Sequence, residues 1–202
     1  LGEEAPVEPA APKTRKAAAA RGAAAGKAAG GPAPAVASAG GRLGGSDLAD
    51  RWLESRLRAV ALETDRRLGE YRLNDAAKGL YDFVWHEYCD WYLEMAKVRL
   101  QQGGAGAEEA RRGILFGLAN VLKLLHPFMP FITEEIWHHL PGMDGDLIVA
   151  PWPDAAALAE DAEAEEAMEL LMETVVSIRN VRSEMNVPPA REAAVSIRAD
   201  AH

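Results

Sequence analysis

The stretch that decides the fold is residues 124–141, Leu-Leu-His-Pro-Phe-Met-Pro-Phe-Ile-Thr-Glu-Glu-Ile-Trp-His-His-Leu-Pro. Pro127 and Pro130 interrupt an otherwise helix-friendly apolar run, because each lacks an N–H and pushes its predecessor out of the α region. One helix must therefore end near Leu125 or His126. A second helix can begin near Pro130, since a proline is tolerated in the first turn. The stretch predicts a sharp, apolar, buried elbow between two helices.

Apolar residues at helical spacing lie on both sides of this elbow. Ser46 is the predicted N-cap of the first helix, Gly69 closes it, and Asn74 caps the second. The predicted helices cover residues 46–69, 74–100, 107–125, 130–139 and 162–187. Long helices with short connections indicate an all-α fold, an antiparallel bundle of about five helices. Residues 192–198 alternate like a short terminal strand.

Composition divides the chain into three parts. Residues 1–45 are mostly Ala, Gly and Pro, and they predict a disordered or loosely helical linker because they have too little apolar side chain to offset the ordering entropy. Residues 46–187 form the predicted helical domain, and residues 188–202 the start of a truncated C-terminal α/β element. An alternative interpretation of the linker is a basic tail that binds RNA through Lys13, Arg15, Lys16, Arg21 and Lys27. These charges are sparse, which favours a plain spacer.

The charge balance limits the possible partners. Beyond residue 45 the chain carries 16 Lys and Arg against 28 Asp and Glu. This excess of acid argues against a nucleic-acid binder, although a local basic cluster can still bind RNA. The stretch 154–173 contains no basic residue and is predicted to face away from phosphate. The single Cys fits a reducing cytoplasm, and no apolar stretch is long enough to span a membrane.

No convergent catalytic set is visible in the sequence. There is no phosphate loop and no Gly-x-Gly-x-x-Gly. Glu135 and His138 have the Glu-x-x-His spacing of helical metal sites, but only one copy is present, so we expect no metal. Cys89 precedes Asp90, whose charge raises a thiol pKa, and we therefore predict a buried, inert cysteine.

Three ordered motifs together carry a family resemblance. The elbow, residues 85–97 and residues 178–189 are similar to the anticodon-binding domain of class I aminoacyl-tRNA synthetases of the valine, isoleucine and leucine group. The run Cys89-Asp90-Trp91-Tyr92-Leu93-Glu94 resembles the valyl members most. The resemblance extends from about Ser46 to the C-terminus. The opening helix and the coiled-coil arm that are usual in this family are not recognisable here.

The resemblance implies a part of a larger valine–tRNA ligase. The parent would join valine to its tRNA with ATP and magnesium, and this part would grip the anticodon stem and loop. The His-Ile-Gly-His-type and Lys-Met-Ser-Lys-Ser-type signatures of the catalytic fold are not found, so we expect this chain to hold no cofactor and to catalyse nothing by itself. The expected partners are tRNA and the parent's catalytic domain, in a cytoplasmic monomer without membrane contact. The alternatives are the isoleucyl or leucyl sister domain, or a helical interaction module without an RNA role, which the acidic balance supports.

Basic residues near helix ends are the candidate tRNA contacts, although such residues also stabilise helix dipoles. On the last helix, Arg179 and Arg182 fall inside the apolar stripe. Two interpretations stay open for this pair: they bind Glu87 and Glu94 inside the bundle, or they line a cleft that faces RNA. The full candidate set is Arg66, Arg67, Arg72, Lys78, Lys97, Arg99, Arg179 and Arg182.

Four aromatic residues of the second helix could stack on bases or pack against other helices. Tyr88 and Trp91 fall in its apolar stripe, whereas Trp85 and Tyr92 lie on one shoulder. Stacking suits single-stranded RNA. We nevertheless predict packing for all four.

Overall fold

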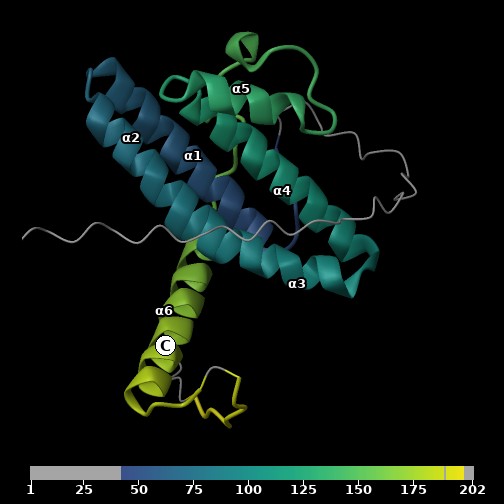
Figure 1. Cartoon of the computed structure of the whole chain (residues 1–202), viewed down its shortest axis with the longest axis vertical. Helices are drawn as coiled ribbons and strands as arrows, with labels where there is room; N and C mark the ends of the chain where they lie inside the picture. The colour runs from purple at the N-terminus through teal and green to yellow at the C-terminus, as the bar shows by residue number, and fades with distance from the viewer. Residues whose placement is uncertain (1–41, 189, 198–202) are drawn as a thin grey trace, which may run out of the picture. The chain divides into compact units, whose positions relative to one another are not determined.

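The computed structural model describes residues 42–188 and 190–197, which all belong to one compact unit, Ala33–His202. The predicted all-α class is confirmed, and the helices of the described residues form five rods because α2, η1 and α3 run into one another (Figure 1). The elements are α1 Leu48–Gly69, α2 Leu73–Asp82, η1 Phe83–Leu93, α3 Glu94–Gln102, α4 Gly104–Leu125, α5 Pro130–His138, η2 Leu147–Val149 and α6 Ala162–Glu184. No described helix is long and apolar enough to cross a membrane.

The predicted strand near the C-terminus is wrong over residues 192–197, which adopt no regular structure. Alternation alone does not make a strand, because a strand needs a neighbour to pair its backbone, and the described residues supply none. Residue 198 lies outside the described ranges, as do residues 1–41, on which the linker and basic-tail interpretations rest.

The beginning of α1 differs slightly from expectation, whereas its end at Gly69 is as predicted. Asp47, not Ser46, is the N-cap, and its side chain accepts a hydrogen bond of 2.9 Å from the backbone N–H of Ala49. An aspartate carboxylate also suits the positive end of the helix dipole. Gly69 is the last helical residue, and the chain turns at Tyr71, which has a φ of 59°.

The middle of the second rod is a π-helix, η1, which the sequence pattern did not indicate. Its wider turns shift the phase of the side chains relative to an α-helix. As a result Phe83, Tyr92 and Ala96 are buried, whereas Val98 is 54% exposed. The expected stripe through Tyr88 is therefore correct only in part.

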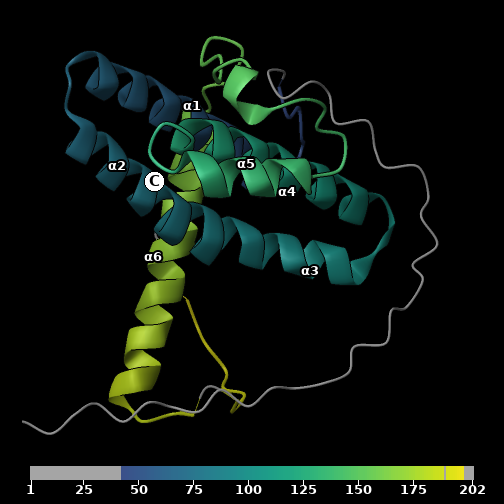
Figure 2. The ribbon, with the colours of Figure 1, turned by 45° about the horizontal axis from the view of Figure 1, so that its top comes forward.

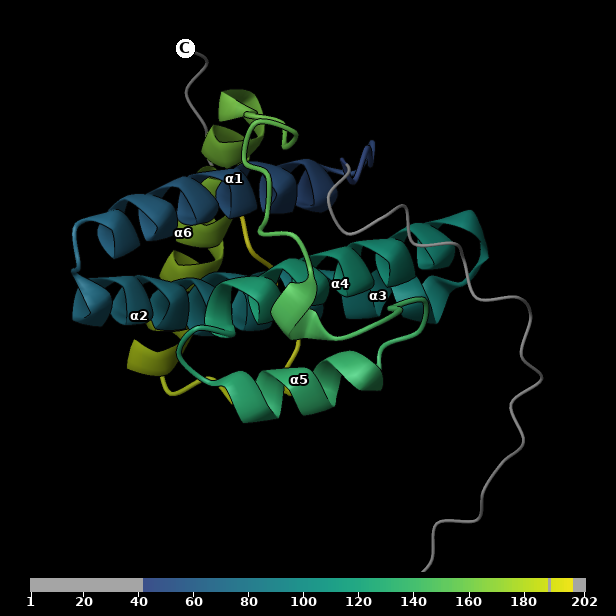
Figure 3. The same ribbon diagram turned by 90° about the horizontal axis from the view of Figure 1, so that it is seen from above.

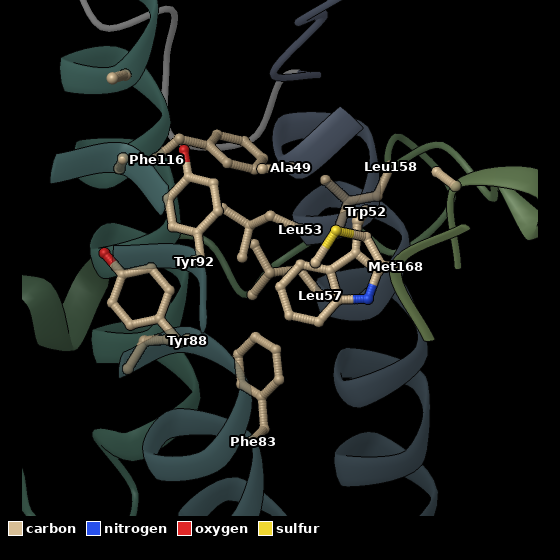
Figure 4. Close-up of a cluster of buried hydrophobic side chains, with 14 residues drawn as sticks. Ala49, Trp52, Leu53, Leu57, Phe83, Tyr88, Tyr92, Phe116, Leu158 and Met168 are labelled. Carbon is tan, nitrogen blue, oxygen red and sulfur yellow. The ribbon is translucent and has the colours of Figure 1, made fainter. Parts of the chain in front are cut away.

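The main core lies where α1, η1, α4 and α6 meet (Figure 4). The rings of Tyr88 and Tyr92 stack with their centroids 5.8 Å apart (Figure 4). Burying a large apolar side chain stabilises a fold by about 1.5 to 3 kcal/mol. The largest contributors are Trp52, Leu53, Leu57, Phe83, Tyr88, Tyr92, Phe116 and Met168.

A buried ion pair fastens α1 to α3 beside this core. Asp50 is 1% exposed, and both of its oxygens accept hydrogen bonds of 2.9 Å from Arg99. The phenol of Tyr92 donates a third bond to the same carboxylate. Burial, and then the negative charge of Asp50, raise the pKa of Tyr92. Gly113 of α4 makes room for the phenol, because a Cβ there would lie 1.8 Å from its oxygen.

The acid-rich segment pairs with α1. Arg51 donates hydrogen bonds of 2.7 and 3.0 Å to Asp161, the N-cap of α6, and lowers the pKa of that carboxyl group. Arg56 and Arg58 bind Glu165 and Glu160 of the same segment. These contacts join the beginning of α6 to α1 (Figure 3). Within α6, Met168 is the last buried side chain.

The elbow has the predicted helix bounds, since α4 ends at Leu125 and α5 begins at Pro130. It is not buried, however: Met129 is 45% exposed and Phe131 is 91% exposed. The reason is that α5 packs on α4 through one face only, which carries Thr133 and Trp137 (Figure 2). The opposite face of the short helix is left in solvent.

Candidate nucleic-acid interface

Two exposed aromatic rings lie on the second rod beside the elbow. The rings of Tyr81 and Trp85 are nearly parallel, with centroids 6.4 Å apart, and the residues are 60% and 55% exposed. The prediction of packing is therefore wrong for Trp85, whereas it is confirmed for the buried Tyr88 and Tyr92. Trp91 is half-buried against the core.

These rings form one wall of an apolar pocket of about 340 Å³. The other wall is the end of α4 and the elbow, through Leu125, Phe128 and Met129. The proline break makes this geometry, because it carries the chain away from α4 directly next to η1. A flat aromatic wall suits a nucleobase, since every base has a π face and stacking tolerates any sequence. We refer to this cavity below as the elbow pocket.

Sequence reasoning missed Tyr81, although a signal was available. Lys78, Tyr81 and Trp85 are spaced i, i+3 and i+7, which places a cation and two aromatic rings on one helix face. Lys78 is exposed and lies 3.3 Å from Asp82. Among the predicted tRNA contacts, Lys78 is the residue that helical spacing places beside the elbow pocket.

The candidate cations at the junction of α1 and α2 form ion pairs within the fold. Arg66 bridges Glu63 and Glu70 at 2.7 Å each. Hydrogen bonds from Arg66, and then from Arg67, lower the pKa of Glu63 to about 2. Arg72 binds Asp75 at 2.8 Å. Phosphate contacts from these residues would have to compete with carboxylates that are already in place.

Two candidates on α3 are also engaged. Lys97 pairs with Glu94. Arg99 is only 13% exposed at its side chain and holds the buried Asp50, and hydrogen bonding to that carboxylate raises its pKa. A contact between Arg99 and RNA would uncover a buried carboxylate, so we leave Arg99 out of the proposed interface.

The two arginines of α6 differ from the others. Arg179 is exposed, lies over the Trp91 ring at 5.7 Å and pairs with no described carboxylate. Internal pairing with Glu87 and Glu94 is therefore wrong for Arg179, because those residues bind Arg56 and Lys97 instead. No described side chain of α6 beyond Met168 is buried, so Arg179 lies at the rim of the bundle and not inside it.

Arg182 stabilises the chain that follows α6. Its guanidinium donates hydrogen bonds of 2.8 Å to the carbonyl of Pro188 and 2.7 Å to that of Arg191. No acidic residue lies between Glu173 and Glu184, so this half of α6 carries only positive charge. The surface is open to an anionic partner.

Two further sequence predictions concern reactive groups. Cys89 is half-buried, and burial together with the charge of Asp90 raises the pKa of its thiol, as expected for an unreactive cysteine. Glu135 does not meet His138; it faces His139 at 3.9 Å. His138 instead approaches Glu134, one turn earlier on the helix.

Comparison with known sequences agrees with this architecture. The family described as "Anticodon-binding domain of tRNA ligase" matches residues 50–197, so the chain belongs to this family of helical domains. Among its relatives are the valine–tRNA ligases of Carboxydothermus hydrogenoformans and Geobacter sulfurreducens, each 48% identical over 73% and 72% of this chain. The valine–tRNA ligase of Bacillus cereus is 40% identical over 77% of it. The resemblance to this part of valyl-tRNA synthetases is thereby confirmed. The matched region covers only 17 to 18% of the length of these relatives.

Proposed function

We propose that this chain binds the anticodon stem and loop of tRNA as the non-catalytic part of a valine–tRNA ligase. Its family membership and its valine–tRNA ligase relatives support this function. The parent enzyme would join valine to tRNA with ATP and magnesium, and its catalytic domain would be the second partner. We place the enzyme in the cytoplasm as a monomer, which the single cysteine fits.

The elbow pocket is the observation that carries the proposal. Large aromatic side chains are normally buried in a fold of this size, yet Tyr81 and Trp85 expose more than half of their surface beside an apolar cavity. An unstacked anticodon base has a flat apolar face and polar edges, so it can enter such a cavity and keep its edges in contact with solvent or protein. We assign base contacts to this pocket, with Lys78 at its margin.

Phosphate contacts are assigned to the basic half of α6. Arg179 lies on an aromatic ring and keeps its guanidinium edge available, whereas most arginines of α1 already hold carboxylates. Because the rest of the domain is acidic, few phosphates can be neutralised. Stacking should therefore supply much of the affinity, and the salt dependence should correspond to only a few phosphates.

A binding titration tests the assignment of the pocket. The 202-residue chain would be titrated with a fluorescent valine-tRNA anticodon stem-loop at fixed salt. Trp85→Ala should raise Kd about 5- to 150-fold, because stacking contributes about 1 to 3 kcal/mol per base. Tyr71→Asn is the matched control, since Tyr71 is 88% exposed, does not line the pocket and has a positive φ that asparagine accepts. Equal Kd values for Trp85→Ala and the parent chain would remove the pocket from the interface.

A further inference from the structure

Three potential metal ligands meet where the loop after α5 returns to that helix. Glu134 and His138 are one turn apart on α5, and Asp146 comes from the loop that leads to η2. His138 Nε2 lies 3.3 Å from a Glu134 carboxylate oxygen and 3.5 Å from an Asp146 carboxylate oxygen. One donor atom from each of the three residues fits within 4.8 Å of the others.

These spacings match what a zinc ion requires. Zinc binds His nitrogen and carboxylate oxygen at about 2.0 to 2.2 Å in tetrahedral geometry, which sets its donors about 3.3 to 3.6 Å apart. Both measured separations fall in that range. Mixed nitrogen and oxygen donors favour zinc over magnesium or calcium, which prefer oxygen alone. We propose that Glu134, His138 and Asp146 bind one Zn²⁺ ion.

The surrounding structure fixes two of these ligands. The Glu134 carboxylate accepts backbone hydrogen bonds of 2.7 Å from Leu147 and 3.2 Å from Ile148, so it is oriented from outside the site. The indole of Trp137 donates a 3.2 Å bond to the Gly145 carbonyl, directly before Asp146. Hydrogen bonds that orient the ligands in this way are a feature of real metal sites.

A fourth nitrogen lies outside this cluster of three, near one of its members. His126 Nε2 is buried, has no hydrogen-bond partner among the described residues and lies 4.0 Å from the second Glu134 oxygen. Its other ring nitrogen is 2.8 Å from the Thr133 hydroxyl, which donates its own proton to the Met129 carbonyl. In the neutral ring Nδ1 therefore carries the proton, and the lone pair is on Nε2. A neutral imidazole with an unused lone pair is the form that binds metal.

Zinc would tie the loop to α5. The loop that follows α5 returns to that helix (Figure 3). It packs there through Leu147 and Trp137, but Asp146 itself is exposed. A metal that bridges the helix and the loop would stabilise the folded chain by mass action, because the donors are not held together when the chain is unfolded. The expected signature is a melting temperature that depends on zinc.

The test uses the full chain after removal of metal with EDTA. Calorimetric titration with Zn²⁺ should give one site per chain, and Co²⁺ should give the visible absorption of a tetrahedral complex. His138→Gln and Asp146→Asn should each weaken Zn²⁺ binding at least tenfold. In EDTA these variants should melt like the parent chain. Zinc about 100-fold above its Kd should raise the parent's melting temperature by about 5 to 10 °C and the variants' by less.

Glu135 and His139 provide a matched control on the same helix. They are also four residues apart, at 3.9 Å, but belong to no described cluster of three ligands. Glu135→Gln and His139→Gln should bind Zn²⁺ like the parent chain. The proposal is overturned if no site of unit stoichiometry is found. It is equally overturned if both control variants weaken binding as much as His138→Gln and Asp146→Asn do.

Discussion

The phenol of Tyr92 donates a 2.8 Å hydrogen bond to the carboxylate of Asp50, 42 positions earlier in the chain. The same carboxylate receives two bonds from Arg99, so one buried acid connects α1, η1 and α3. Disturbing this group should destabilise the fold, because removing one member of a buried ion pair leaves the other charge without its partner.

Removal of one partner of this acid and removal of the acid itself should have unequal effects. Tyr92→Phe deletes one hydrogen bond and keeps the ion pair, so we expect a loss of about 1 kcal/mol in the free energy of unfolding. Asp50→Ala leaves Arg99 inside the fold and should cost about 3 kcal/mol or more. Urea denaturation followed by circular dichroism measures both. Equal losses would show that the carboxylate is not the centre of the network.

Gly113 tests how closely α4 approaches η1. The Cβ of Gly113→Ala would lie 1.8 Å from the Tyr92 oxygen, so overpacking should destabilise the fold by about 2 to 3 kcal/mol. Gly106 lies in the same helix with nothing within 4 Å of its Cβ position. Gly106→Ala should therefore stabilise the chain by about 0.5 kcal/mol through helix propensity alone. Thermal and urea denaturation measure the stability of both variants. A change in the same direction for Gly113→Ala and Gly106→Ala would contradict the packing argument.

The link between α1 and α6 should depend on pH. Arg51 depresses the folded-state pKa of Asp161 below its ordinary value of 3.8. This contribution is complete above about pH 5 and is lost as the pH falls through the folded-state pKa. Asp161→Asn, which keeps a capping side chain, should lower the melting temperature by about 1 to 4 °C at pH 7. The difference should shrink as the pH falls through the lowered folded-state pKa of Asp161. A constant difference across that range would exclude the ion pair as its cause.

Arg179 and Arg66 should affect RNA binding differently. If Arg179 contacts a phosphate, Arg179→Ala should lower the slope of log K against log salt by about 0.7 to 0.9. Arg66 holds Glu63 and Glu70, so Arg66→Ala should leave that slope unchanged. Titrations of an anticodon stem-loop at several salt concentrations measure both slopes. An unchanged slope for Arg179→Ala would remove α6 from the interface.

Local rules predicted the rods and the elbow well. The prolines at 127 and 130 place two helix ends without any tertiary information, and these ends are observed at Leu125 and Pro130. The exposure of the elbow was not predictable in the same way. Whether Phe131 is buried depends on how α5 leans on α4, and that angle follows from Thr133 and Trp137 seating on the neighbouring helix.

The candidate site was harder to predict for a related reason. A helical wheel assumes one period, and η1 departs from it, so the wheel assigned Tyr92 to a shoulder although its side chain is completely buried. Ion pairs between distant segments were also invisible. Nothing near Arg56 in the sequence indicates that it takes Glu87, and this pairing leaves Arg179 without the partner that the pattern suggested.

The attachment of α6 mainly through its beginning has a mechanical consequence. Its last buried side chain is Met168, and from there to Glu184 the helix continues for about 24 Å at 1.5 Å per residue. A stiff helix that is held near its beginning enlarges small rotations. A tilt of about 10° around Met168 would move Glu184 sideways by about 4 Å, so a small shift of Asp161 would become a larger shift of Arg182.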